Sequence, residues 1–273
     1  NTTMLINGKP VDSVISYADL KTVIPGRKDF LDPNESSKID RLISSREEIA
    51  FLPTYLMETH MQDEKYQKAK YKIILMGIFK DGRRVNVILD NIEPYFEVRI
   101  PDGDSESMKN QIADIIERLN RDELTTPVKK SLISAKPFKY YQPNKSKFLR
   151  LYYTKTKNRQ AAINLIRKEG YQTTSDDLNS YYRVVCRDYL TTFSSWASLA
   201  KYEPCQSTLL KGETYRLSVA DYKIYSGTIT NDMLRDKSMS MCWDVETWSP
   251  DGAVPQPEVR SNAIFCLSTT FHW

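Results

Sequence analysis

The sequence has few of the features that mark zinc-binding, secreted or membrane proteins. Its 273 residues include only four cysteines and two histidines, and none of the cysteines forms a Cys-x-x-Cys pair: Cys186, Cys205, Cys242 and Cys266. We therefore expect no zinc site, and we expect the thiols to stay reduced, as in an intracellular protein. No apolar run approaches the roughly 18 to 20 residues of a membrane span, and the N-terminal residues lack the apolar core of a signal peptide.

The length of the chain indicates two domains, and its net charge argues against a protein that binds DNA by charge alone. The chain carries 39 basic and 35 acidic side chains, a formal charge of +4, which is too small an excess for a histone-like DNA-binding protein. With 40% apolar residues it can bury one large core or two modest ones. It begins with Asn1 and ends with Phe271-His272-Trp273 inside an apolar stretch, so we expect a piece of a longer protein.

Three segments have the residue pattern of β-strands. Residues 71–79 form a β-rich run, residues 80–83 carry the Asp-Gly signal of a hairpin turn, and residues 84–89 alternate like a half-buried strand. A further strand is predicted at residues 95–100 and is ended by Pro101-Asp102-Gly103. We interpret these segments as one three-stranded sheet.

Two amphipathic helices complete the pattern. The first has apolar residues at spacings of three and four on one face, and either Asp104 or Ser105 can cap its start: Met108, Ile112, Ile115, Ile116 and Leu119. An extended segment at 148–153 is followed by a second helix at 158–169, with Gly170 as its C-terminal cap. A charged stretch near residues 38–48 is typical of a solvated helix or a disordered leader. The order of elements predicts an α+β fold with a ferredoxin-like part.

A basic stretch between residues 128 and 159 contains no acidic residue. Its lysines Lys129, Lys130, Lys139 and Lys145 are candidates for contacts with the DNA backbone. The interleaved aromatics could stack on the bases of a single strand: Phe138, Tyr140, Tyr141, Phe148, Tyr152 and Tyr153. The alternative is that these aromatics pack inward as ordinary strand residues while the lysines keep the surface solvated.

One carboxylate pair has the arrangement of a metal site. In an extended strand Asp244 and Glu246 project from the same face, because residues two apart share a face. Carboxylate oxygens are the ligands that Mg²⁺ prefers, and two Mg²⁺ ions are a common device for phosphodiester hydrolysis. Alternating acids also occur on the solvent face of edge strands. A second strand-like run at 262–271 can return beside the first.

The block around this pair resembles the first exonuclease motif of family B DNA polymerases: an apolar run, Asp-Val-Glu-Thr, a polar turn with a proline, and a second strand. Upstream, Gly77 through Pro101 is similar to the N-terminal segment Gly…Gly-Arg…Pro-Tyr-Phe-Tyr-Val of that family. Residues 176–196, with Tyr181-Tyr182-Arg183 and Arg187-Asp188, resemble the approach to the exonuclease domain. From about residue 70 onward the pattern is most similar to polymerases of large cytoplasmic DNA viruses of the asfarvirus type.

The resemblance implies a domain order and a function. Residues 1–60 would be a leader of unknown role, 61–235 the N-terminal domain, and 236–273 the opening strands of an RNase H-like 3′–5′ exonuclease domain. Asp244 and Glu246 match the two metal-binding carboxylates of the first motif, with Mg²⁺ as the cofactor. The remaining exonuclease and polymerase motifs would lie beyond Trp273, so this portion alone is expected to be inactive.

The partners of the intact protein would be a DNA primer-template, dNTPs and a processivity factor, at a viral replication site in the host cytoplasm and with no membrane. One rival is a non-enzymatic nucleic-acid-binding module that uses the basic aromatic stretch 128–159. Another is an unrelated two-metal nuclease. We interpret Trp196, Trp243 and Trp248 as core residues, and Arg183 and Arg187 as surface ion pairs on a helix rather than as phosphate contacts.

Overall fold

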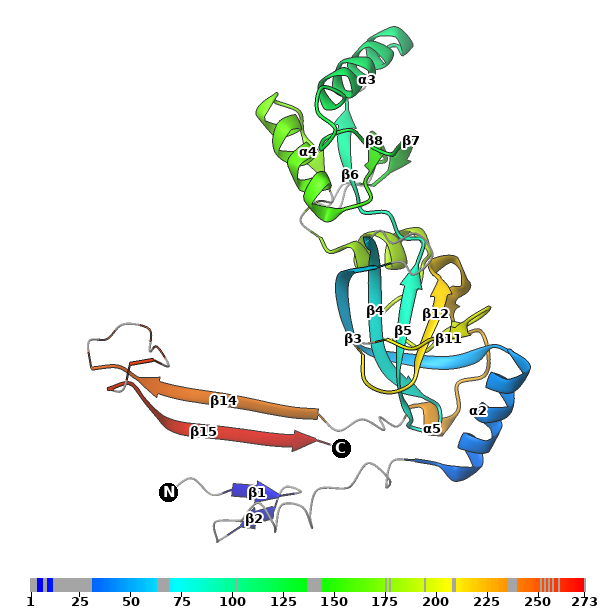
Figure 1. Cartoon of the computed structure of the whole chain (residues 1–273), viewed down its shortest axis with the longest axis vertical. Helices are drawn as coiled ribbons and strands as arrows, with labels where there is room; N and C mark the ends of the chain where they lie inside the picture. Colours follow the sequence, from blue (N-terminus) through cyan, green and yellow to red (C-terminus); the bar gives the residue numbers. More distant parts are fainter. Residues whose placement is uncertain are drawn as a thin grey trace. The chain divides into compact units, whose positions relative to one another are not determined.

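The chain folds into two compact units. The computed structural model describes residues 4–6, 9–11, 31–62, 69–101, 103–136, 144–174, 176, 178–193, 195–207, 210–234, 240–250, 252, 254, 256, 258–259 and 261–272 (Figure 1). One unit consists of residues 1–36, 81–83 and 228–273, and the other of residues 37–80 and 84–227. Among the described residues, no helix is long and apolar enough to cross a membrane.

A seven-stranded sheet forms the larger part of the second unit, with the strand order β11-β12-β5-β4-β3-β10-β13. Its strands are β3 (Ile49–Gln62), β4 (Ala69–Phe79), β5 (Arg84–Asp90), β10 (Ala197–Leu199), β11 (Glu203–Pro204), β12 (Thr214–Ser218) and β13 (Tyr222–Ile224). All neighbouring pairs are antiparallel except β5 and β12, which run parallel. A short 3₁₀ helix, η3 (Val219–Asp221), lies between β12 and β13.

The predicted hairpin is confirmed as β4 and β5. Gly82 has φ 87°, a left-handed conformation that glycine adopts without steric cost. One carboxylate oxygen of Asp81 accepts a hydrogen bond from the backbone N–H of Arg83 at 2.9 Å, which fixes the turn. The turn chemistry and the alternation of the flanking residues therefore determine this hairpin locally.

One face of the seven-stranded sheet carries the main hydrophobic core. Ile73, Leu75 and Phe79 of β4 pack there with β5, β3 and the later strands. The core is completed by Ile39 of helix α2 (Pro33–Ser45) and by η2 (Tyr181–Asp188), a π-helix that contributes Tyr181, Val184 and Val185.

A separate four-stranded sheet carries the two predicted helices, with the chain order β6 (Tyr95–Ile100), α3 (Ser105–Leu119), β7 (Lys129–Ala135), β8 (Ser146–Tyr152), α4 (Thr156–Lys168) and β9 (Thr173–Thr174). The strand order is β7-β8-β6-β9, and every pair is antiparallel. Apolar residues of β6 and β8 pack against both helices. Asp104 caps α3 by accepting the N–H of Ser107 at 2.7 Å, and Gly170 has φ 83° after α4.

The prediction of one three-stranded sheet was wrong, because β6 pairs with β8 and β9 and not with β5. Asn91, with φ 60°, and the irregular segment 92–94 end β5 and redirect the chain. Hydrophobic alternation predicts each strand correctly, but it contains no information about which strands pair.

The first unit is built around two hairpins. β1 (Met4–Ile6) pairs with β2 (Lys9–Val11), and β14 (Ser240–Trp248) pairs antiparallel with β15 (Ala263–His272). Asp32 caps the start of α2 by accepting the backbone N–H of Asn34 at 3.0 Å, and a short helix α5 (Asn231–Leu234) precedes β14. The predicted return strand at 262–271 and the α+β fold are confirmed, while the domain boundaries at 60 and 235 stay predictions.

Candidate metal-binding pair, basic edge and arginine network

Asp244 and Glu246 lie at alternate positions of β14, as the strand pattern predicts. Opposite them on β15 are Ser268 and Cys266, and the pairing register shifts directly after Glu246. Both acidic side chains are exposed. Two residues along a strand separate their Cα atoms by about 6.6 Å, so the carboxylates leave the same face of the hairpin at neighbouring positions.

This donor set suits a divalent cation of the hard type but does not complete its coordination. Carboxylate oxygens are suitable Mg²⁺ ligands, and Mg²⁺ usually takes one or two protein carboxylates together with water and substrate phosphates. Within the part of the chain that the structure describes, no group of three or more His, Cys, Asp or Glu side chains converges on one point. By themselves, Asp244 and Glu246 supply fewer ligands than such a cation takes.

One of the three tryptophans assigned to the core corrects that expectation. The side chain of Trp248 is 54% exposed, so its assignment to the core was wrong. Trp196 is half-buried, and the side chain of Trp243 lies outside the described residues. Trp248 is the last residue of β14, opposite Ala263 in a two-stranded sheet.

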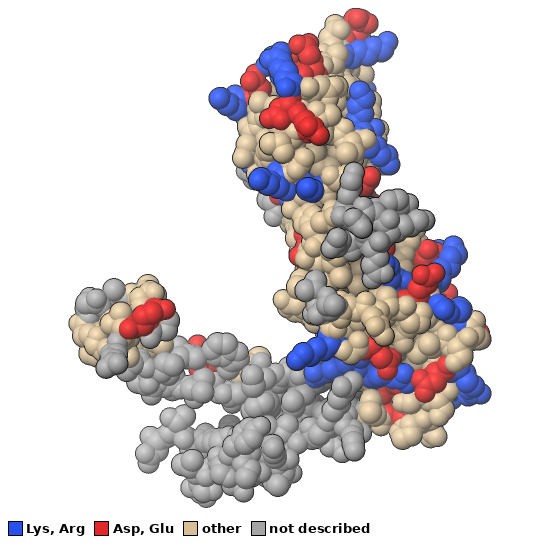
Figure 2. Space-filling view, in the orientation of Figure 1, with Lys and Arg blue, Asp and Glu red and all other residues tan. Residues whose placement is uncertain are grey.

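The candidate DNA-contacting lysines follow one edge of the four-stranded sheet. Lys129 and Lys130 start β7, which is the edge strand, and both are exposed. Lys145 is exposed just before β8, beside the far end of β7, and Lys139 lies outside the described residues. From Lys130 to Ala135 the strand rises about 17 Å, so the lysines form a line and not a cluster. In Figure 2 blue atoms follow the side of the molecule where Figure 1 places β7 and β8.

Two of the three described aromatic residues of the same stretch pack inward, while Phe138, Tyr140 and Tyr141 lie outside the described residues. Phe148 and Tyr153 are each 1% exposed. The Tyr153 hydroxyl donates to the carbonyl oxygen of Thr125 at 3.1 Å, and its ring stacks on Phe96. Tyr152 is half-buried, with the ammonium of Lys129 4.9 Å from its ring centroid. The interpretation of these aromatics as strand residues packing inward is confirmed for Phe148 and Tyr153, which cannot stack on bases while the sheet is folded.

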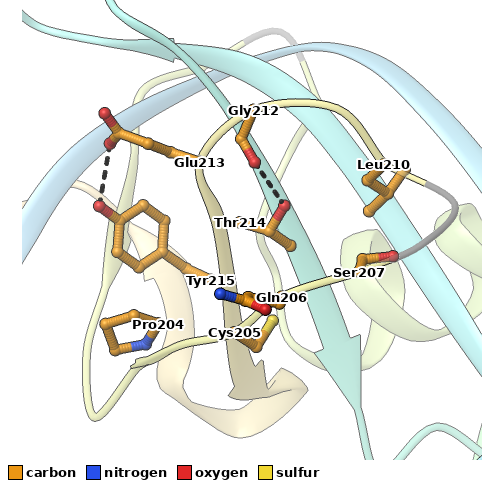
Figure 3. Close-up of a pocket in the computed structure, with 9 residues that line it drawn as sticks. All are labelled: Pro204, Cys205, Gln206, Ser207, Leu210, Gly212, Glu213, Thr214 and Tyr215. Carbon is orange, nitrogen blue, oxygen red and sulfur yellow. Dashed lines mark hydrogen bonds between the residues drawn. The ribbon is translucent and has the colours of Figure 1, made fainter.

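A cavity of about 510 Å³ lies in the second unit, beside β12 (Figure 3). Its wall includes Glu213, whose carboxylate accepts the hydroxyl of Tyr215 at 3.1 Å, and Thr214, which donates to the carbonyl of Gly212 at 3.2 Å. Asn86 supports the wall by donating its side-chain amide to the carbonyl of Lys211 at 3.0 Å. Among the described lining residues there is an acid and no Lys or Arg, so the cavity is unsuited to holding phosphate.

The expectation of a surface ion pair is wrong for Arg183 but is met in part by Arg187, whose Nε lies 3.3 Å from a carboxylate oxygen of the exposed Asp188. Arg183 is 1% exposed and donates to the carbonyl oxygen of Tyr95 and to the hydroxyl of Ser180. Arg187 donates to the carboxylate of Glu97 at 2.7 Å. Both guanidinium groups turn toward β6, because the tertiary fold places a buried carboxylate and a backbone carbonyl there.

Glu97 and Asp188 are the acidic partners of this network. The side chain of Glu97 is 1% exposed and accepts hydrogen bonds from Arg187 and from Arg150, the latter at 3.0 Å. Arg150 of β8 also donates to Asp188 at 2.8 Å. Burial opposes the charge of Arg150, but its interactions with Tyr95, Asp188 and Glu97 outweigh burial and raise its pKa.

Tyr95 lies at the centre of the network. The Cζ atoms of Arg150, Arg183 and Arg187 lie 4.1, 5.4 and 5.5 Å from its ring centroid, within the range of cation–π attraction. Its hydroxyl donates to the carbonyl oxygen of Arg183 at 3.0 Å and accepts from Arg187 at 2.5 Å. Burial raises the pKa of this phenol. Burial, followed by the charge of Arg159, lowers the pKa of Arg183 to about 10.

Glu97 is the residue of this network that sequence analysis missed. A signal was present, because Glu97 is an acid between Phe96 and Val98 in a strand that is otherwise buried. An acid at such a position needs a basic partner, since an unpaired charge is rarely buried. Arg187 is about ninety residues away in the sequence, so the sequence pattern around Glu97 could not identify it as the partner.

Comparisons with known proteins connect the chain to viral DNA polymerases. No protein-family model matches it. It is 26% identical over 248 residues to "DNA polymerase beta" of African swine fever virus isolate Tick/Malawi/Lil 20-1/1983, covering 89% of this chain and 19% of that protein. The protein of the same name from isolate Pig/Kenya/KEN-50/1950 is 24% identical over the same length and coverage.

A solved structure of the family B DNA polymerase from the archaeon Pyrobaculum calidifontis superposes on 82% of this chain, which corresponds to 25% of the archaeal chain. The two are 15% identical in sequence, with a TM-score of 0.49. The chain spans about a fifth of the length of the curated viral relatives. The predicted resemblance to polymerases of the asfarvirus type is confirmed: over most of its length this chain is similar in sequence to the DNA polymerase of African swine fever virus.

Proposed function

We propose that this chain is the N-terminal portion of a family B DNA-directed DNA polymerase that ends within a 3′–5′ proofreading exonuclease domain. The observation that carries the proposal is the sequence similarity to a viral DNA polymerase over 89% of the chain, in a chain whose residues 244–247 read Asp-Val-Glu-Thr. The hairpin β14–β15 fits the opening strands of an RNase H-like domain. The strand order β7-β8-β6-β9, with α3 and α4 on one face, fits a ferredoxin-like part.

Asp244 and Glu246 would hold Mg²⁺ at the exonuclease site. The bound ions supply a more acidic attacking water and stabilise the leaving oxygen of the phosphodiester. The contribution of this chain is positional: a paired strand keeps both carboxylates on one face, and their exposure leaves them accessible to a DNA 3′ end. Further ligands and the polymerase motifs belong to the rest of the protein, so this portion alone would neither polymerise nor proofread.

The basic edge of β7 and β8 would hold DNA by its phosphates. Lys129, Lys130 and Lys145 are exposed, whereas Phe148 and Tyr153 are buried, so charge is available and base stacking by these rings is not. Phosphate contacts position a protein without reading sequence. In the intact protein the partners would be a primer-template, dNTPs and a processivity factor, in the host cytoplasm.

Degradation of a mismatched primer by the full-length parent tests the exonuclease assignment. The variant Asp244→Ala/Glu246→Ala is compared with wild type in Mg²⁺, with primer extension measured in the same samples. Glu258→Ala is the matched control, because Glu258 is an exposed acid between the same two strands. We expect the double variant to lose degradation and keep extension, and the control to keep both. Degradation that persists in the double variant would overturn the metal assignment.

One rival function keeps a specific observation in its favour. A non-enzymatic nucleic-acid-binding module would need only the exposed lysines of the basic edge. In that case DNA binding would depend on these lysines, and neither Mg²⁺ nor Asp244 and Glu246 would affect any activity of the parent. The absence of primer degradation by the wild-type parent, together with lost DNA binding in a lysine variant, would favour this module.

A further inference from the structure

The backbone of η2 is wound more widely than an α-helix. The N–H of Tyr189 donates to the carbonyl oxygen of Val184 at 3.1 Å, five residues earlier, which is the spacing of a π-helix. Beyond the end of η2, the N–H of Thr191 donates to the carbonyl oxygen of Val185, six residues earlier, at 3.0 Å. The π-helical segment spans eight residues, whereas most π-helices are single-turn bulges inside α-helices. A rare backbone conformation persists only where its surroundings hold it in place.

One side of η2 is held by hydrophobic packing. Tyr181, Val184 and Val185 belong to the core of the seven-stranded sheet. This packing anchors the segment but is not directional, because apolar contacts tolerate more than one helical winding. The hydrophobic side therefore does not by itself select the π conformation.

The other side of η2 is held by directional polar contacts to β6 and β8. Arg187 reaches Glu97 of β6, and Asp188 accepts from Arg150 of β8. The carbonyl oxygen of Arg183 accepts the hydroxyl of Tyr95, and the guanidinium of Arg183 donates to the carbonyl of the same tyrosine. These bonds fix the positions of residues 183, 187 and 188 at the same time, so a change of winding would break several of them together.

We propose that η2 is an ionic joint between the two sheets: the network of Glu97, Arg150, Arg187 and Asp188 holds the segment in its π conformation. When the network loses a charge, residues 181–191 open or rewind locally while both sheets stay folded. Glu97 is the critical member because it is the most buried carboxylate and accepts from two guanidinium groups. Removing one partner of a buried ion pair leaves an uncompensated charge, which is costly.

Amide hydrogen exchange of the whole chain tests this joint. Glu97→Gln keeps the shape of the side chain and removes its charge. We expect exchange of the amides of 181–191 to become roughly tenfold faster or more, with β4 and α3 unchanged, because opening is local. The control is Glu117→Gln, which breaks an exposed ion pair with Arg121 and should leave all rates unchanged. Unchanged exchange in 181–191, or equal acceleration throughout the chain, would overturn the proposal.

Two further variants keep the proposal falsifiable if Glu97→Gln fails to fold. Arg187→Lys keeps the charge but loses the planar fork of donors, so it should accelerate the same segment by a smaller factor. Glu97→Gln/Arg187→Gln removes both charges and should recover part of the protection lost in Glu97→Gln. If the losses of Glu97→Gln and Arg187→Gln, measured singly, simply add in the double variant, Glu97 and Arg187 do not act together and the joint is excluded.

Discussion

The guanidinium carbon of Arg150 lies 4.1 Å from the ring centroid of Tyr95, on adjacent antiparallel strands of one sheet. The two residues are 55 positions apart in sequence, and the contact exists only because β6 pairs with β8. Around this contact the structure gathers three arginines, two carboxylates and a phenol on the face of the sheet opposite its helices. Substitutions of Tyr95 therefore test how much this network contributes to the free energy of unfolding.

Replacing Tyr95 separates its hydroxyl from its ring. Tyr95→Phe keeps the ring beneath Arg150 but removes a hydroxyl bonded to Arg187 and to the Arg183 carbonyl, so it should lower the free energy of unfolding by about 1 to 3 kcal/mol. Tyr95→Ala also removes a buried ring and should cost about 3 to 5 kcal/mol. Urea unfolding measures both. Equal losses in the two variants would show that the ring contributes nothing.

Gly77 should tolerate no side chain. A Cβ at this position would lie 2.1 Å from the carbonyl oxygen of Leu52 and 2.6 Å from the Phe51 ring. We expect Gly77→Ala to lower the free energy of unfolding by about 1 to 3 kcal/mol or more, because backbone on β3 would have to move. Gly103→Ala is the control, since its Cβ would make only ordinary contacts at 3.6 Å. A denaturation midpoint for Gly77→Ala equal to that of the control would contradict the close packing of β3 on β4.

His60 should make stability depend on pH below neutrality. Burial, followed by the charge of Lys155, lowers the pKa of His60 below 6.5, and its Nε2 accepts the N–H of Thr156 at 3.4 Å. Between the lowered folded value and the unfolded value of 6.5, the unfolded chain binds more protons than the folded chain. Stability is therefore lost as the pH falls through this window, and the loss levels off below the folded value.

The variant His60→Gln tests this dependence, because it removes the titrating group and keeps a polar side chain. Its free energy of unfolding should change less than that of wild type between pH 7.5 and the acidic end of the window. The difference between the two proteins isolates His60 from all other titrating groups. A wild-type pH dependence that is identical to that of the variant would show that His60 is not responsible.

The basic edge should bind DNA through phosphates and not through bases. With the parent protein, Lys129→Ala/Lys130→Ala should reduce the slope of log K against log salt by about 0.7 for each lost contact with a single strand. Lys201→Ala/Lys223→Ala removes the same charge from exposed positions of the other sheet and should leave the slope unchanged. Oligonucleotides with and without bases should bind this edge equally, because Phe148 and Tyr153 are buried. Weaker binding of abasic strands would show that bases contribute to binding and would favour stacking by aromatic residues of this stretch.

Local patterns predicted the elements more reliably than their partners. The β4–β5 hairpin follows from Asp81-Gly82 and the flanking alternation, and α3 follows from its apolar stripe with Asp104 as the cap. The third predicted strand is correct as a strand but belongs to another sheet, because pairing depends on residues about fifty positions away. Trp248 was expected in the core, since its size favours burial, yet the described hairpin leaves it exposed.

In the candidate site, too, some features could be predicted from the sequence and others could not. Asp244 and Glu246 share a face because alternation along a strand is a local property of the backbone, so their geometry could be predicted from the sequence. The orientation of Arg183 and Arg187 could not, because nothing near them in sequence indicates Glu97 and Tyr95 as partners. The sequence also left open whether the aromatics of the basic stretch face solvent or core, and burial decides that question for Phe148 and Tyr153 among the described residues.

The sequence by itself determined what depends on neighbours within about ten residues: turns, caps, the two helices, the alternating strands and the spacing of the carboxylate pair. Only the tertiary structure decided which strands pair, that the lysines line an edge while Phe148 and Tyr153 are buried, and that Glu97 joins two arginines. The physical reason is that backbone conformation is set by local sterics and hydrogen bonds. Burial and ion pairing require side chains that only the folded chain brings together.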